Sequence, residues 1–340
     1  ISFKGFANEM YYHLESENGM HYRDYTGCGN TINANHPVVA QLLQQSVEYW
    51  VTEMHVDGFR FDLASALARG EQGEVLQHAP VLWNIASSSA LAETRLIAEA
   101  WDATGMSHRG NFPGLRWIEW NGDYRDVVRR FLRGDPGLIG ELASRITGSS
   151  DLFGASGALP TSSINFVTCH DGFTLADLVS YTHKHNENNG EDNRDGSDCN
   201  HSSNWGVEGE TDDAEILSIR RQQAKNHLIL LMLSQGVPML LGGDEMLRTQ
   251  HGNNNAWCQD NEIGWLDWSL ADTNAGIVRF TREAIALRKR HPAMRRKRYM
   301  TGEVRPETLG LPDISWHGVH LSEPDWQDPA GQELAFTLAP

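Results

Sequence analysis

Three carboxylates stand at the ends of short apolar segments. Asp62 follows GFRF at 58–61, Glu99 follows RLIA at 95–98, and Asp171 follows INFVTCH at 164–170. Retaining hydrolysis of a glycosidic bond needs an ionised carboxylate as nucleophile and a protonated carboxyl group roughly 5–5.5 Å away. A further anionic group stabilises the positive charge that develops at the sugar. The pattern therefore predicts glycoside chemistry if the fold gathers these three side chains.

The neighbours of two of these carboxylates differ in character. Arg60 lies two positions before Asp62, on the same face of an expected strand, and its positive charge favours the ionised carboxylate. Glu99 is flanked by Ala98 and Ala100, an apolar setting that favours the protonated form. We interpret Asp62 as the nucleophile and Glu99 as the acid. The structural alternative is a salt bridge at a strand end, since ion pairs also occur in purely structural positions.

Strands and helices alternate along most of the chain. Strands are expected near 55–65, 95–101, 115–120, 164–169 and 237–241, and helices near 37–54, 75–91, 124–132, 138–146, 214–233 and 276–288 with a further start near 174. This alternation favours βα units around a parallel sheet. The carboxylates are separated by 37 and 72 residues, which fits one and two such units.

The predicted fold class is α/β, a TIM-type (β/α)8 barrel that is incomplete at its N-terminus. In such a barrel the active-site residues come from the carboxyl ends of several strands. A doubly wound open sheet is the alternative, but it usually carries a glycine-rich phosphate loop after its first strand. We assign residues 1–292 to the C-terminal portion of the barrel. Residues 293–340, with short segments and few helix signals, are predicted to start a C-terminal β-sandwich domain.

Composition narrows the possible partners. The 340 residues carry a net charge of −17, which argues against nucleic acid or an anionic membrane surface and suits a neutral ligand. The four cysteines form no CxxC pair and fit a reducing compartment, so a cytoplasmic location is expected. The apolar run at 227–243 is interrupted by polar residues and Pro238, which argues against a membrane span.

A long polar loop is expected at 182–213. Loops of this length usually have a function or are disordered. His183 and His185 raise the possibility of a metal site, but their spacing matches no helical or ribbon metal motif. We therefore predict no metal and no cofactor.

Several motifs carry a family resemblance. GFRFD at 58–62, IAEAWD at 97–102 and FVTCHD at 166–171 resemble the three later sequence motifs of the α-amylase superfamily. Three longer motifs are similar to its glycogen debranching and isoamylase branch: DYTGCGNT at 24–31, THKHNENNGEDNRDG at 182–196 and QHGNNNAWCQDN at 250–261. The resemblance extends over nearly the whole chain.

The resemblance implies a role for each motif residue. Asp62 would be the nucleophile, Glu99 the general acid/base and Asp171 the transition-state stabiliser. The implied activity is retaining hydrolysis of α-1,6 branch linkages in glycogen, limit dextrin or amylopectin, as part of glycogen catabolism. The partner would be a branched α-glucan, with no cofactor.

Further residues of these motifs are expected to bind the substrate. Arg60 and His170 match positions that contact the nucleophile and the sugar at the cleavage site, and Trp101 is expected to line the pocket.

Other functions remain open within this resemblance. They are a non-catalytic glucan-binding or regulatory isoamylase-like protein, an α-glucan branching enzyme or other transferase, and a trehalose-releasing hydrolase. The three carboxylates disfavour a non-catalytic role. The family's first motif, Asp-x-x-x-Asn-His, is absent from the sequence. We therefore expect either a fragment of a longer gene product, which lacks the first three barrel strands and the amino-terminal β-sandwich, or a chain that is unstable or inactive alone.

Overall fold

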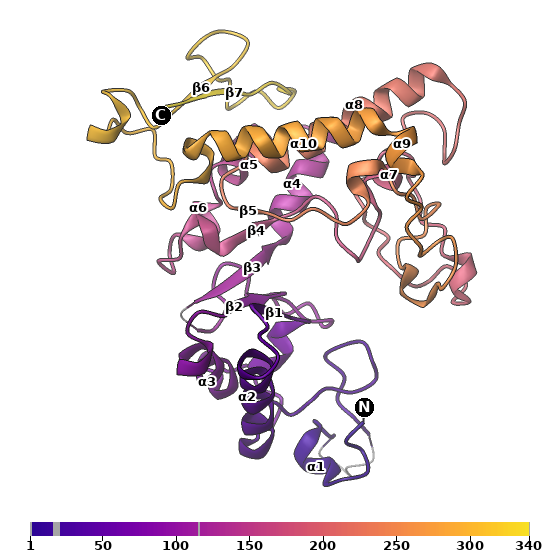
Figure 1. Ribbon diagram of the computed structural model, residues 1–340, viewed down its shortest axis with the longest axis vertical. Coiled ribbons are helices and arrows are strands. Elements are labelled where there is room, and N and C mark those ends of the chain that lie inside the picture. Colours follow the sequence, from indigo (N-terminus) through magenta and orange to yellow (C-terminus); the bar gives the residue numbers. More distant parts are fainter. Residues whose placement is uncertain (1, 16–20, 115, 340) are drawn as a thin grey trace. The chain divides into compact units, whose positions relative to one another are not determined.

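The chain divides into two compact units, each with its own core. The computed structural model describes residues 2–15, 21–114 and 116–339. The first unit comprises Ile1–Trp120 and Leu152–Ala158, and the second comprises Asn121–Asp151 and Leu159–Pro340. Figure 1 shows the elements coloured along the sequence.

The first unit consists of three parallel strands, with two helices before the first strand and one between the first and the second. Its helices are α1 (Asn8–Tyr11), α2 (Pro37–Thr52) and α3 (Pro80–Ser87), and its strands are β1 (Gly58–Phe61), β2 (Arg95–Ala98) and β3 (Trp117–Asn121), the last of which reaches the boundary. Strand β1 pairs with β2, and β2 with β3, both in parallel. These pairings confirm the predicted α/β class with a parallel sheet.

Apolar side chains of the strands form the core of the first unit. Leu96 is 1% exposed and packs in a cluster with Leu82, Ile85 and Trp117. The Phe61 and Trp117 ring centroids are 4.9 Å apart in an edge-on arrangement that aromatic pairs favour. The core thus fixes the carboxyl-terminal ends of β1 and β2.

The second unit is mainly helical. Its helices are α4 (Gly122–Arg133), α5 (Ile139–Ile146), α7 (Leu175–Leu178), α8 (Ala214–Leu233), α9 (Leu270–Thr273) and α10 (Ala275–Arg290), while α6 (Ser150–Phe153) lies at the boundary. Strand β4 (Ser163–Asn165) pairs in parallel with β5 (Val237–Pro238). Helices α8 and α10 run side by side (Figure 1).

Capping side chains define the ends of α8. The Asp213 carboxylate accepts hydrogen bonds from the backbone N–H groups of Glu215 (2.9 Å) and Ile216 (3.2 Å), which stabilises its N-terminus. At the other end, Arg288 of α10 donates to the carbonyls of Met232 (2.8 Å) and Ser234 (2.7 Å). The guanidinium satisfies carbonyl groups that a helix end leaves without partners.

A two-stranded antiparallel pair, β6 (Ile314–His317) and β7 (Ala335–Leu338), lies within residues 293–340. The domain boundary at 292 stays a prediction. No helix in the described ranges is long and apolar enough to cross a membrane.

Some predicted elements are wrong in extent. The helix expected at 75–91 begins only at Pro80. The strands expected at 164–169 and 237–241 shrink to three and two residues, and Pro238 has no N–H with which to continue a ladder. The strand expected near 55–65 comprises only Gly58–Phe61, and the φ of +40° at Leu63 takes that residue out of the strand. Leu115, at the start of the third expected strand, lies outside the described residues.

We predict that Leu96→Ala destabilises the protein by about 2–5 kcal/mol, because it leaves a cavity in a fully packed core. Urea denaturation followed by tryptophan fluorescence measures the change, since Trp117 lies in the same cluster. Val38→Ala on the exposed face of α2, where the residue is 46% exposed, is the control and should change stability by less than about 0.5 kcal/mol. Equal midpoints for the two variants would contradict the assigned core.

Candidate active site

The ends of β1 and β2 place two of the predicted carboxylates at one edge of the sheet. Phe61 pairs with Ala98 in parallel register, so Asp62 and Glu99 follow at equivalent positions. The Glu99 N–H donates to the Phe61 carbonyl (3.1 Å), and the Ala64 N–H donates to the Glu99 carbonyl (2.9 Å). The ladder therefore continues past the strands and fixes both backbones.

Arg60 bridges the two carboxylates. Its Nη1 lies 2.6 Å from Oδ1 of Asp62, and its Nη2 lies 2.8 Å from Oε2 of Glu99. The guanidinium carbon also lies 4.5 Å from the centroid of the Trp120 ring, a cation–π contact. The same Glu99 Oε2 accepts from the Leu63 N–H at 2.8 Å, which the left-handed turn at Leu63 brings into reach.

The two carboxylates differ strongly in exposure. The Asp62 side chain is 71% exposed, whereas the Glu99 side chain is 3% exposed. The predicted apolar setting of Glu99 is wrong in one respect, because Arg60 reaches across from β1 and places a cation against it. With Arg60 between them, the exposed Asp62 could serve as a nucleophile and the buried Glu99 as an acid.

Trp101 and Trp120 take different places. Trp101, the predicted pocket residue, is half-buried, and its backbone N–H donates to the Glu99 carbonyl at 2.9 Å. Trp120, which sequence reasoning missed, is 8% exposed and supports Arg60. Its position at the end of β3, equivalent to the carboxylates on β1 and β2, was the available signal.

A buried ion pair supports the loop that follows Glu99. Arg69 Nη2 lies 2.6 Å from Oδ2 of Asp102, and Arg69 also stacks 3.7 Å from the Tyr25 ring centroid. Burial would raise the pKa of Asp102, but hydrogen bonds from Arg69 and Thr104 outweigh it and lower that pKa. Asp102 also accepts from the Met106 N–H at 3.1 Å, so one carboxylate closes the loop.

His170 and Asp171 lie together in the second unit. His170 Nε2 is 3.6 Å from Asp171 Oδ2, and both side chains are more than half exposed. The Gly172 N–H donates to the Asn254 carbonyl at 3.0 Å. Asp171 borders a cavity of about 220 Å³ that Arg125 and Asn254 also line.

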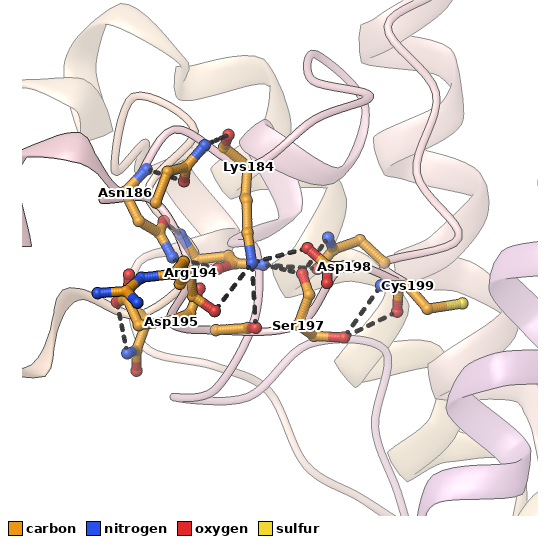
Figure 2. A network of polar contacts seen from close by, with 12 residues as sticks. Lys184, Asn186, Arg194, Asp195, Ser197, Asp198 and Cys199 are labelled. Atoms are coloured by element: carbon orange, nitrogen blue, oxygen red, sulfur yellow. Dashed lines mark hydrogen bonds and ion pairs between the residues drawn. The ribbon is translucent and has the colours of Figure 1, made fainter. Parts of the chain in front are cut away.

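An internal lysine organises the loop at 182–213. Figure 2 shows the Lys184 ammonium at the centre of a ring of acceptors. Its Nζ lies 2.7 Å from Oδ1 of Asp198 and 3.4 Å from the carbonyls of Arg194 and Gly196. Asn186 Nδ2 donates to the Asp195 carbonyl at 2.9 Å. The loop is therefore ordered around a buried cation of the chain.

The two histidines of this loop meet at Glu208. The backbone N–H of His183 donates to Glu208 Oε1 at 2.9 Å, and the ring Nε2 of His185 lies 3.2 Å from the same oxygen. Within the described part of the chain, no group of three or more His, Cys, Asp or Glu side chains could hold a metal ion.

A buried glutamate holds the loop before β3. The Glu119 carboxylate accepts from the N–H groups of Gly110 (2.7 Å) and Phe112 (3.2 Å). Burial raises the pKa of Glu119 to about 7, although these hydrogen bonds act in the opposite direction.

Curated relatives match nearly the whole chain. It is 52% identical over 330 residues to a glycogen operon protein GlgX homolog of Mycobacterium tuberculosis, with 96% of this chain and 46% of the relative covered. Identity is 45% over 339 residues to the chloroplastic isoamylase 3 of Oryza sativa subsp. japonica, covering 99% of this chain and 42% of that protein. A glycogen debranching enzyme of Klebsiella pneumoniae is 47% identical over 300 residues, with 88% and 44% covered. The chain spans a little under half the length of these relatives.

Solved structures give the same fold. A mutant pullulanase from Paenibacillus barengoltzii complexed with maltotetraose matches with a TM-score of 0.70 at 22% identity, covering 99% of this chain and 46% of that one. A pullulanase from Anoxybacillus sp. LM18-11 matches with a TM-score of 0.64 at 27% identity, with 87% and 38% covered. No family model matches the chain.

Glu119 should make stability depend on pH. Its pKa is near 4.5 when unfolded and about 7 when folded, so the folded state binds the proton more tightly. Stability therefore falls as pH rises from about 4.5 to about 7 and is constant above, an effect on the order of 3 kcal/mol. Glu119→Gln cannot titrate and should show a smaller loss between pH 5 and pH 8 in urea denaturation. The same slope in both proteins would contradict the prediction.

Lys184→Met should loosen the loop, because it leaves the carbonyls around the ammonium without their donor, at a cost of about 1–3 kcal/mol. We expect faster hydrogen exchange across residues 184–198, measured by mass spectrometry. Asp198→Asn is the matched control: the Asp198 side chain is 90% exposed, and exposed ion pairs contribute little. Faster exchange in the control alone would assign the loop's order to the surface pair instead.

Proposed function

Because this chain belongs to the glycogen debranching and isoamylase branch of the α-amylase superfamily, we propose that it takes part in retaining hydrolysis of α-1,6 branch linkages in glycogen or a related α-glucan. The observation that carries the proposal is the bridge from Arg60 to Asp62 and Glu99. A single guanidinium contacts both carboxyl groups, and a retaining mechanism needs two such groups close together, roughly 5–5.5 Å apart.

The proposed mechanism gives the exposed and the buried carboxylate different roles. Asp62 attacks the anomeric carbon while Glu99 transfers a proton to the departing glycosidic oxygen, which leaves a covalent glycosyl ester on Asp62. Glu99 then removes a proton from water, which attacks the same carbon and releases Asp62. Two displacements at one carbon give retention of configuration.

The contacts of Glu99 suggest which oxygen carries the proton. Its Oε2 accepts from the Leu63 N–H and lies 2.8 Å from the Arg60 Nη2, so a proton on that oxygen would face a donor and a cation. We assign the transferred proton to Oε1. Arg60 also donates to Asp62, the proposed nucleophile, at 2.6 Å.

Asp171 and His170 complete the proposal through their motif positions. Asp171 would stabilise the positive charge of the transition state, and His170, Arg60 and Trp101 would contact the sugar. The exposure of the Asp171 side chain, 67%, supports a role toward a ligand.

The wider setting is proposed on the same basis. The parallel strands would belong to a (β/α)8 barrel, which the likeness to solved pullulanases supports. A neutral branched glucan suits the net charge of −17 better than an anionic partner does. The described cysteines Cys28, Cys169, Cys199 and Cys258 are free thiols, which supports a reducing compartment such as the cytoplasm.

Asp62→Asn should lower kcat on amylopectin by at least ~1,000-fold in the full-length protein while glucan binding is kept, because only the nucleophile is lost. The parent should deepen the iodine colour of amylopectin but leave that of linear amylose unchanged, and NMR should show the α anomer first. Asp57→Asn, at the exposed opposite end of the same strand, is the control with expected parental activity.

Retained turnover in Asp62→Asn would reassign the nucleophile. Chains transferred to another glucan, with no gain of reducing ends, would point to a transferase. A parent that binds glucan but cleaves none would leave a non-catalytic binding role.

A further inference from the structure

A fully buried carboxylate holds both ends of the segment that carries Asp171. Asp244 lies at the start of the 3₁₀ turn Asp244–Met246 after β5, and it is 0% exposed. Its Oδ2 accepts the hydroxyl hydrogen bond of Thr168, and its Oδ1 accepts from the Leu175 N–H at 2.9 Å. Thr168 lies three residues before Asp171 and Leu175 lies four residues after it.

The two donors are themselves anchored. Thr168 is 1% exposed and Leu175 is 0% exposed, so both ends of the segment lie in the interior. Between them, the Asp171 side chain is 67% exposed. An exposed side chain cannot be fixed by packing on all sides, so its position depends on the backbone that carries it.

Charges around Asp244 bear on the strength of this arrangement. Burial raises the pKa of Asp244 to about 7, and Glu245 adds to the rise, while the hydrogen bonds from Thr168 and Leu175 and the charge of Arg248 act in the opposite direction. Arg129 of α4 also faces it with a positive charge. A buried carboxylate is costly unless it is hydrogen-bonded. Both carboxylate oxygens of Asp244 accept a hydrogen bond.

We propose that Asp244 is a positioning residue for Asp171, whose carboxylate fixes residues 168–175 so that Asp171 meets the substrate in one orientation. This inference rests on the proposed function for its catalytic consequence. Asp244 would touch no substrate. It acts through Thr168 and Leu175 on the residue that stabilises the transition state, where a displacement of about 1 Å can cost ~100-fold in rate.

The test compares kcat and KM on a branched glucan. Asp244→Asn offers one acceptor oxygen for two donors, so we expect kcat to fall by ~10- to 100-fold while KM changes less than ~3-fold. Thr168→Val should fall similarly. Thr168→Ser keeps the hydroxyl, so its kcat should stay within ~3-fold of the parent value. The two Thr168 variants also test the proposal if Asp244→Asn fails to fold.

A double-mutant cycle separates positioning from general damage. In an Asp171→Asn background the carboxylate to be positioned is gone, so adding Asp244→Asn should lower kcat by less than ~3-fold. A further loss as large as in the parent background would overturn the proposal.

Asp313→Asn is the matched structural control. Asp313 is 2% exposed and accepts from the N–H groups of Thr301 (3.1 Å) and Gly302 (2.8 Å), so its loss should lower stability and leave kcat intact. Hydrogen exchange at residues 169–174 should rise in Asp244→Asn and not in Asp313→Asn. Equal exchange at residues 169–174 in both variants would overturn the positioning role of Asp244.

The two proposals fail differently. A full-length parent that leaves branched glucan uncut overturns the proposed function and with it the catalytic role of Asp244. A parent that cuts, with kcat unchanged in Asp244→Asn and Thr168→Val, overturns the positioning role alone.

Discussion

The guanidinium of Arg60 is the constraint on which the first unit depends. Parallel strands β1 and β2 end in register, which brings two carboxylates to one edge where their charges would repel. Arg60 offsets that repulsion because it donates to Asp62 and forms an ion pair with Glu99, and Trp120 supports it from β3. The turn at Leu63 adds a backbone donor to Glu99. Removing the cation would leave a carboxylate that is 3% exposed facing another anion, a costly arrangement.

Elsewhere the chain uses buried polar side chains in the place of regular secondary structure. Asp102 and Glu119 accept from backbone N–H groups of loops, Asp244 accepts from the first N–H of α7, and Lys184 donates to loop carbonyls. Loops that carry functional residues have few ladder hydrogen bonds, yet their backbone polar groups must find partners. An internal carboxylate or ammonium supplies several partners from one point. This accounts for ordered long loops in a chain whose strands are only two to five residues long.

The sequence allowed most helices to be predicted, and it placed Asp62 and Glu99 directly after β1 and β2, because both features depend on local patterns. Asp171 lies six residues beyond the end of β4, further from its strand than predicted. Helix α8 has the predicted bounds, Ala214–Leu233, since Asp213 caps it and polar residues follow it. The partners of those carboxylates were not predictable. The contact from Leu63 to Glu99 spans 36 residues, and that from Thr168 to Asp244 spans 76. Such pairs are set by tertiary packing, and periodicity carries no information about them. The sequence GGDE at 242–245 likewise gives no local sign that its aspartate, Asp244, is buried.

Glu99 and Asp171 show two ways of fixing a carboxylate. Glu99 is buried, and Arg60 and Leu63 orient its oxygens directly. Asp171 is exposed, so water competes for its oxygens and only the backbone beneath it can be held in the interior. In the proposed function Asp171 meets a branched glucan, so its side chain must stay exposed. A buried residue such as Asp244 then holds the backbone on both sides of Asp171, through Thr168 and Leu175. The burial that this requires raises the pKa of Asp244. In this fold a residue with a strongly shifted pKa can therefore be one that positions a reacting group, and need not be the reacting group itself.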